Sequence, residues 1–300
     1  MSISLPEGLV SLKLIGDANT LELPNITNWH DLNYLSNVKL HTWMFESDSN
    51  QLLTVSSVQN FINELPQDSL QKLELILDPP STKPNTYQAS QLDSLSFRHL
   101  HNLKELKFTS LARSFNVLPW YDLSKLPQSL TSLTLDLQVE HYSDDLPPNL
   151  KHLDMNLTLI KTTVDKFWRT YLSPMNYLTT LAAKVNYTKC IDLRGLNFNN
   201  LRSVSFVGSS LSDDHDSNVT TILIDSSIVA PGAQLLSFKM EDRLFPKSEH
   251  HTYMKFDETS CDNNFNCSDS CSKKLAKEIF QLKPSSMFTW FGDDMDFYYY

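Results

Sequence analysis

Five residues near the C-terminal end have side chains of the types that bind zinc. They are His250, His251, Cys261, Cys267 and Cys271. Imidazole and thiolate ligands suit Zn²⁺, but the C-x5-C-x3-C spacing lacks the tight C-x-x-C knuckle of structural zinc sites. Two interpretations follow. The segment is a weak candidate for a metal site, and with it a metal-dependent enzyme, or it carries free thiols in a polar stretch.

Other polar groups suggest catalysis less strongly. Asp213, Asp214, His215 and Asp216 are consecutive, so they cannot all turn toward one ion, and a solvated turn is expected there. His152 precedes Asp154 by two residues, which suits either a catalytic base or a paired surface histidine. Neither common glycine-rich phosphate loop occurs. We therefore expect no catalytic residues and no cofactor.

A repeated sequence motif predicts the elements that position these groups. Residues 126–159 read LPQSLTSLTLDLQVEHYSDDLPPNLKHLDMNLTL, in which Leu-Pro leads twice into leucines at slots 1, 4 and 6. Slots 4 and 6 share one face of a strand, and the proline suits a position just outside it. One such unit cannot bury its own apolar face, so stacked units are expected.

Ten units fit this phrase. Their first slots are Leu9, Leu35, Leu70, Leu103, Leu130, Leu150, Leu178, Leu201, Val219 and Leu235. Apolar residues at helical spacing predict helices in 54–65 and 161–172. The repeats therefore predict one domain over 1–243. Residues 244–300 would form a polar segment, a short helix over 273–283 and an acidic-aromatic tail, which is either a cap or a free binding peptide.

The recurring LxxLxL phrase resembles the leucine-rich repeat family, and its Leu-Pro lead-in is similar to fungal repeat proteins linked to filamentous growth or to F-boxes. The resemblance implies an α/β solenoid, with a curved parallel sheet on the concave side and helices and irregular segments on the convex side. The family's turn asparagine matches only at Asn186. Irregular turns, with their backbone groups bonded in other ways, are therefore expected.

The resemblance also implies protein binding on the concave sheet, through residues that alternate with the inward leucines. Carried over slot by slot, that face consists of Lys13, Lys39, His41, Lys72, Glu74, Lys107, Thr134, Asp136, His152 and Asp154. A graded charged surface of this kind would orient a partner. The alternative is that these are simply solvated outward positions.

Composition narrows the partner. The net charge of -10 argues against general binding to nucleic acid or to anionic membranes. We find no apolar run long enough to span a bilayer and no secretory signal, so an intracellular location, cytoplasm or nucleus, is expected. The expected function is a non-enzymatic scaffold for another protein, with a role in regulating fungal growth or morphology. A ubiquitin-ligase substrate receptor is the alternative.

Overall fold

The structure is a computed structural model. It describes residues 2–16, 23–43, 54–78, 89–110, 118–158, 160, 164–172, 175–186, 190–193, 196, 200–209, 219–224, 237–242, 251–256 and 289–290. The chain divides into two compact units, unit 1 (Met1–Leu150) and unit 2 (Lys151–Tyr300). The sequence analysis placed a boundary at residue 243.

The described elements are mostly short strands. Unit 1 contains β1 (Ser2–Ile3), β2 (Ser11–Ile15), β3 (Asn25–Ile26), η1 (Trp29–Asp31), β4 (Asn37–Trp43), α1 (Val55–Glu64), β5 (Lys72–Asp78), η2 (Ala89–Ser94), β6 (Glu105–Ser110), β7 (Leu118–Asp122), η3 (Leu123–Lys125), β8 (Ser132–Asp136) and β9 (Val139–Ser143). Unit 2 contains β10 (His152–Leu157), α2 (Val164–Tyr171), β11 (Thr180–Asn186), β12 (Cys190–Asp192), β13 (Ser203–Ser209), β14 (Val219–Ile224), β15 (Ser237–Asp242), β16 (His251–Phe256) and β17 (Thr289–Trp290).

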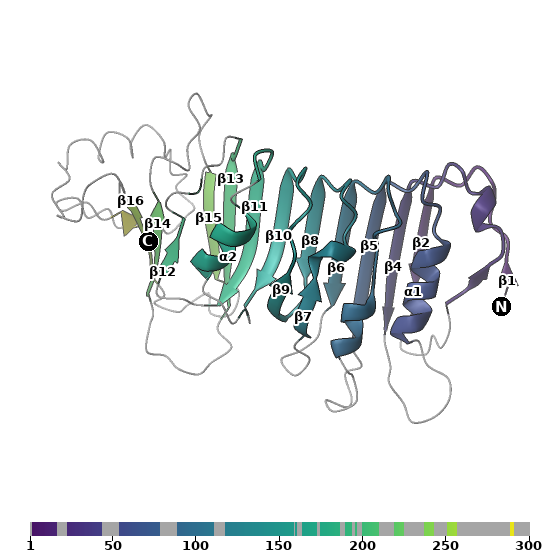
Figure 1. Ribbon diagram of the computed structural model, residues 1–300, viewed down its shortest axis with the longest axis horizontal. Coiled ribbons are helices and arrows are strands. Elements are labelled where there is room, and N and C mark those ends of the chain that lie inside the picture. Colours follow the sequence, from purple (N-terminus) through teal and green to yellow (C-terminus); the bar gives the residue numbers. More distant parts are fainter. Residues whose placement is uncertain are drawn as a thin grey trace. The chain divides into compact units, whose positions relative to one another are not determined.

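In unit 1, β2, β4, β5, β6 and β8 form one parallel sheet in that order (Figure 1). Equal slots of the repeat pair across every step: Leu12, Val38, Leu73, Leu106 and Leu133 lie in one row. All five are at most 9% exposed. The predicted inward strand positions are therefore confirmed.

The same backbone hydrogen bonds recur from one sequence repeat to the next, although the repeats differ in length. The carbonyl of Val10 accepts hydrogen bonds from the N–H groups of Ser36 and Asn37. The carbonyl of Ser36 accepts in the same way from Gln71 and Lys72, and the pattern continues through Gln71 and Lys104. These hydrogen bonds thus align the start of each strand with the start of the strand before it.

A side chain just before the first leucine also joins neighbouring turns. Ser69 Oγ donates to the Leu35 carbonyl at 2.9 Å, and Ser129 Oγ donates to the Leu103 carbonyl at 2.7 Å. Asn102 Nδ2 donates to the Asp68 carbonyl at 2.9 Å. These bonds satisfy backbone carbonyls in the turns that lead into the strands. The sequence analysis missed them, although Ser-Leu or Asn-Leu recurs in the lead-ins.

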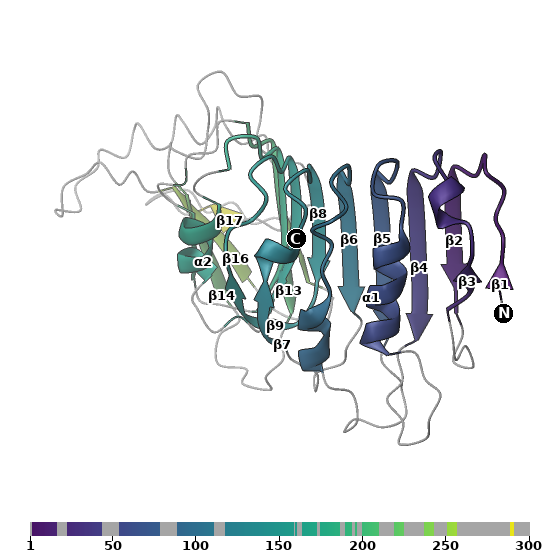
Figure 2. The same ribbon diagram turned by 45° about the vertical axis from the view of Figure 1, so that its right-hand side comes forward.

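Helix α1 covers one face of the unit 1 sheet (Figure 2). Thr54 caps it, because its side chain accepts the Ser57 N–H. Val58 and Ile62 are fully buried, and Phe61 meets Trp29 edge-to-face at 5.5 Å. The helix predicted over 54–65 is confirmed. The parallel pair β7–β9 was not predicted, since its strands carry no repeat phrase.

Unit 2 contains a parallel sheet of β10, β11, β13 and β15. Helix α2 confirms the second predicted helix. The ninth sequence repeat, however, does not stack on the eighth. Strand β13 pairs directly with β15, and β14 belongs to a second parallel sheet, β12–β14–β16–β17. The polar segment predicted after residue 243 also contains a strand, β16.

The protein is thus mostly parallel sheet with few helices, an α/β-like arrangement. Its core consists of the inward leucines and a smaller set of aromatic side chains. Among the described residues, none of the helices combines the length and the apolar character that crossing a bilayer demands.

Candidate functional site

The outward positions of the unit 1 sheet form three rows of side chains, which we call the ladder face. The rows follow from the strand register: Ser11, Asn37, Lys72, Glu105 and Ser132; Lys13, Lys39, Glu74, Lys107 and Thr134; Ile15, His41, Ile76, Thr109 and Asp136. These rows contain all eight of the unit 1 residues that the sequence analysis assigned to a binding face. The structure thus brings those residues onto one surface.

Glu74 lies between two lysines on neighbouring strands. Its carboxylate is 2.9 Å from Lys39 Nζ and 3.0 Å from Lys107 Nζ. The Glu74 side chain is 17% exposed, whereas Lys39 and Lys107 are 34% and 49% exposed. The carboxylate is therefore partly enclosed, and the two ammonium groups remain accessible beside it.

The electrostatics of Glu74 follow from this geometry. Partial burial opposes its ionisation, but the hydrogen bonds and charges of Lys39 and Lys107 outweigh burial and hold the pKa of the Glu74 carboxyl below its usual value. In the adjacent row, Lys72 Nζ lies 2.7 Å from Glu105. That hydrogen bond and the charge of Glu105 raise the pKa of Lys72. Both shifts favour the charged form of the group concerned, the carboxylate of Glu74 and the ammonium of Lys72.

Lys13 extends the central row beyond this triad. It lies in register with Lys39, is exposed, and has no ion-pair partner within the described residues. The central row therefore holds three lysines and one glutamate. Two positive charges are left unbalanced there, in a chain whose net charge is -10.

Two apolar residues on the ladder face were missed by the sequence analysis. Ile15 is 63% exposed, and Ile76 is partly exposed two strands away, with His41 between them in register. They stand one position past the slot-6 leucine, so their apolar character by itself suggests a continuation of the inward face. Parity along the strand would have identified them, because Ile15 and Ile76 alternate with Leu14 and Leu75.

The two predicted residues of unit 2 lie on β10. His152 Nδ1 shares a hydrogen bond with Thr180 Oγ1 on β11, opposite it in register. Asp154 is paired in register with Ala182, which is followed by Ser205 on β13. His152 is thus bonded across the strands to a hydroxyl group, and the row of Asp154 continues through two small side chains to Lys239 on β15.

The weak zinc candidates His250, Cys261, Cys267 and Cys271 lie outside the described residues, and His251 begins β16. Asp213–Asp216 also lie outside them. Within the described ranges, we find no group of three or more His, Cys, Asp or Glu side chains arranged to hold a metal ion.

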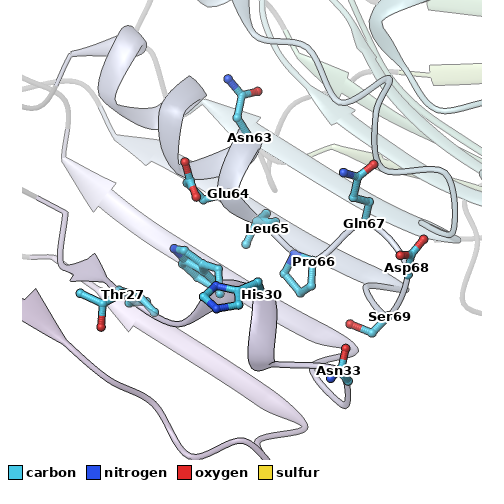
Figure 3. A pocket seen from close by; sticks show the side chains of 12 residues that line it. Thr27, His30, Asn33, Asn63, Glu64, Leu65, Pro66, Gln67, Asp68 and Ser69 are labelled. Carbon is cyan, nitrogen blue, oxygen red and sulfur yellow. The ribbon is translucent and has the colours of Figure 1, made fainter.

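An open groove of about 490 Å³ lies between η1 and the connection from α1 to β5. Figure 3 shows its polar side chains spread along both walls. His30 makes its ion pair with its exposed neighbour Asp31, at 3.4 Å. Ser69 is used in the turn, where its hydroxyl donates to backbone carbonyls. The groove therefore does not show the converging acid and base that catalysis needs.

One carboxylate pair sits beside the β7–β9 strands. Asp122 accepts the Ser124 N–H at 2.9 Å. Its hydrogen bond with Asp144 and its negative charge raise the pKa of the Asp144 carboxyl. Asp144 has a left-handed backbone, with φ of 59°. Asp122 caps η3 through its hydrogen bonds with Ser124, which is a structural role at the start of that helix.

Comparisons with protein-family models, with curated proteins and with solved structures found no match to this chain.

Proposed function

We propose that this chain is a leucine-rich repeat solenoid without enzymatic activity, and that it binds another protein through the ladder face. The single observation that carries the proposal is the central row: Glu74 is ion-paired with Lys39 and Lys107 across three strands, and both ammonium groups remain accessible. A sheet face that served only solubility would not need its charges held in fixed positions.

The rest of the ladder face supports the same function. Ion pairs hold long side chains in defined positions, which lowers the entropy lost when a partner binds them. Exposed Ile15 supplies apolar area next to those charges. Charged groups of fixed geometry beside a modest apolar patch are the features that give protein interfaces their specificity. Repetition supports the fold proposal, because equal slots pair at every step of the unit 1 sheet.

The test is a variant that inverts the central row and keeps its ion pairs: Lys39→Glu, Glu74→Lys and Lys107→Glu together. Because each pair survives with its signs exchanged, the fold should be retained while the presented charge pattern is reversed. Proteins captured from an extract by the wild-type chain should be lost from this variant. Purified candidates are then measured directly by calorimetry.

The matched control is Lys104→Gln with Lys151→Gln, which alters the net charge by the same amount. Both lysines are exposed and lie outside the three rows. The control should capture the same proteins as the wild-type chain. Equal capture by the inverted variant and the wild type would refute binding through the ladder face, provided that circular dichroism shows both folded.

A further inference from the structure

We infer that the ladder face takes an acidic segment of its partner, bound at the β2–β4 side where Lys13 and Lys39 lie next to each other. This inference rests on the proposed function and adds the chemistry of the partner. It selects one part of the face and one class of ligand, an anionic stretch of polypeptide with carboxylate side chains.

The central row carries more positive than negative charge. Glu74 is shared by Lys39 and Lys107, so one carboxylate faces two ammonium groups. Lys13 adds a third positive charge beside Lys39, and no acidic side chain among the described residues pairs with it. Like charges directly opposite each other on a parallel sheet repel. A bound carboxylate would relieve that repulsion.

The chain as a whole is acidic, in contrast to the central row. With a net charge of -10, the protein as a whole repels acidic polypeptides. A local surplus of positive charge is then a selective feature, because it is the part of the ladder face toward which an anionic segment is drawn. The paired Lys72 and Glu105, 2.7 Å apart, add no surplus in the adjacent row.

The spacing of Lys13 and Lys39 suits an extended peptide. Neighbouring strands are about 4.8 Å apart, and alternate side chains of an extended segment are about 7 Å apart. Lysine side chains are long and flexible enough to span that difference, so consecutive outward carboxylates can reach Lys13 and Lys39. Exposed Ile15 stands one row away on the same strand as Lys13 and offers contact to an apolar neighbour of the acidic residues.

The experiment uses the full chain and a fluorescently labelled oligo-glutamate peptide, followed by anisotropy at low salt. The wild-type chain should bind this probe and should not bind an oligo-glutamine peptide of equal length. Lys13→Glu should weaken binding at least about threefold, and Lys13→Gln with Lys39→Gln about tenfold, since exposed charge pairs contribute about 0.2–1 kcal/mol each. Added salt should weaken binding in every case.

Lys104→Glu is the matched control, because Lys104 is exposed in the same unit, lies outside the rows and undergoes the same charge change. It should bind the probe within about twofold of the wild type. An undetectable interaction with the wild-type chain, or an equal loss in Lys104→Glu, overturns the inference. If the inverted-row variant still loses its captured proteins in that case, the proposed function stands and the partner chemistry is wrong.

Discussion

The two units have similar inner positions and different outward ones. In unit 1, Leu73 and Leu75 on β5 are buried, as Leu181 and Ala183 are on β11 of unit 2. On the outward side, the central row of unit 1 carries Lys39, Glu74 and Lys107. The corresponding row of unit 2 passes from Asp154 through Ala182 and Ser205 to Lys239, so its charged residues are separated by two small ones.

The contrast separates folding from recognition. Inward slots are constrained by packing, because a cavity or an unpaired polar group there is costly. Outward slots are constrained only by their neighbours across the strands. In unit 1 three charged side chains are adjacent in one row, whereas two small residues separate Asp154 from Lys239 in unit 2, and the adjacent charges are the reason for placing the proposed charged partner on unit 1.

The largest expected effect tests whether the inner positions are equivalent. Leu75→Ala in unit 1 and Leu181→Ala in unit 2 should each lower the free energy of unfolding by about 2–5 kcal/mol, because both leucines are at most 1% exposed. Urea denaturation of the two variants measures this loss. A cost under about 1 kcal/mol in one unit alone would show that its core is not packed like the other.

A smaller effect tests the difference between the outward faces. Glu74→Gln removes the carboxylate that two lysines share and leaves them near each other, so it should destabilise unit 1 by about 1 kcal/mol. Ser205→Ala, at the corresponding row of unit 2, should stay within about 0.5 kcal/mol of the wild type. Thermal unfolding of both variants gives the comparison. Equal effects would remove the distinction that we draw between the two faces.

The smallest effect is the pH dependence of that difference. Because the pKa of Glu74 is lowered in the folded chain, its ion pairs stabilise the fold above the usual glutamate pKa of about 4.5 and are lost as pH falls through the folded-state value. The stability gap between wild type and Glu74→Gln should therefore be present at neutral pH and close in acid. Denaturation curves at several pH values measure it. A gap that widens in acid would contradict the ion-pair assignment.

Local patterns predicted a large part of this fold. Slot spacing identified the inward leucines of both units, and helical spacing identified α1 and α2. Neither kind of spacing revealed β7 and β9, because these strands carry no repeat motif. Their pairing joins Leu118 with Val139 and Trp120 with His141. The residue types of the ladder face were also foreseen. Its ion pairs were not, because their partners come from strands separated by some thirty residues of sequence.

The amino-acid order alone settles which side chains of each strand face inward, since alternation along an extended backbone is a local property. It also settles where charge is available. Only the tertiary structure decided which strands are neighbours: β13 accepts β15, and β14 joins β12 and β16 instead. Pairing depends on the competition between free strand edges, which no single segment encodes.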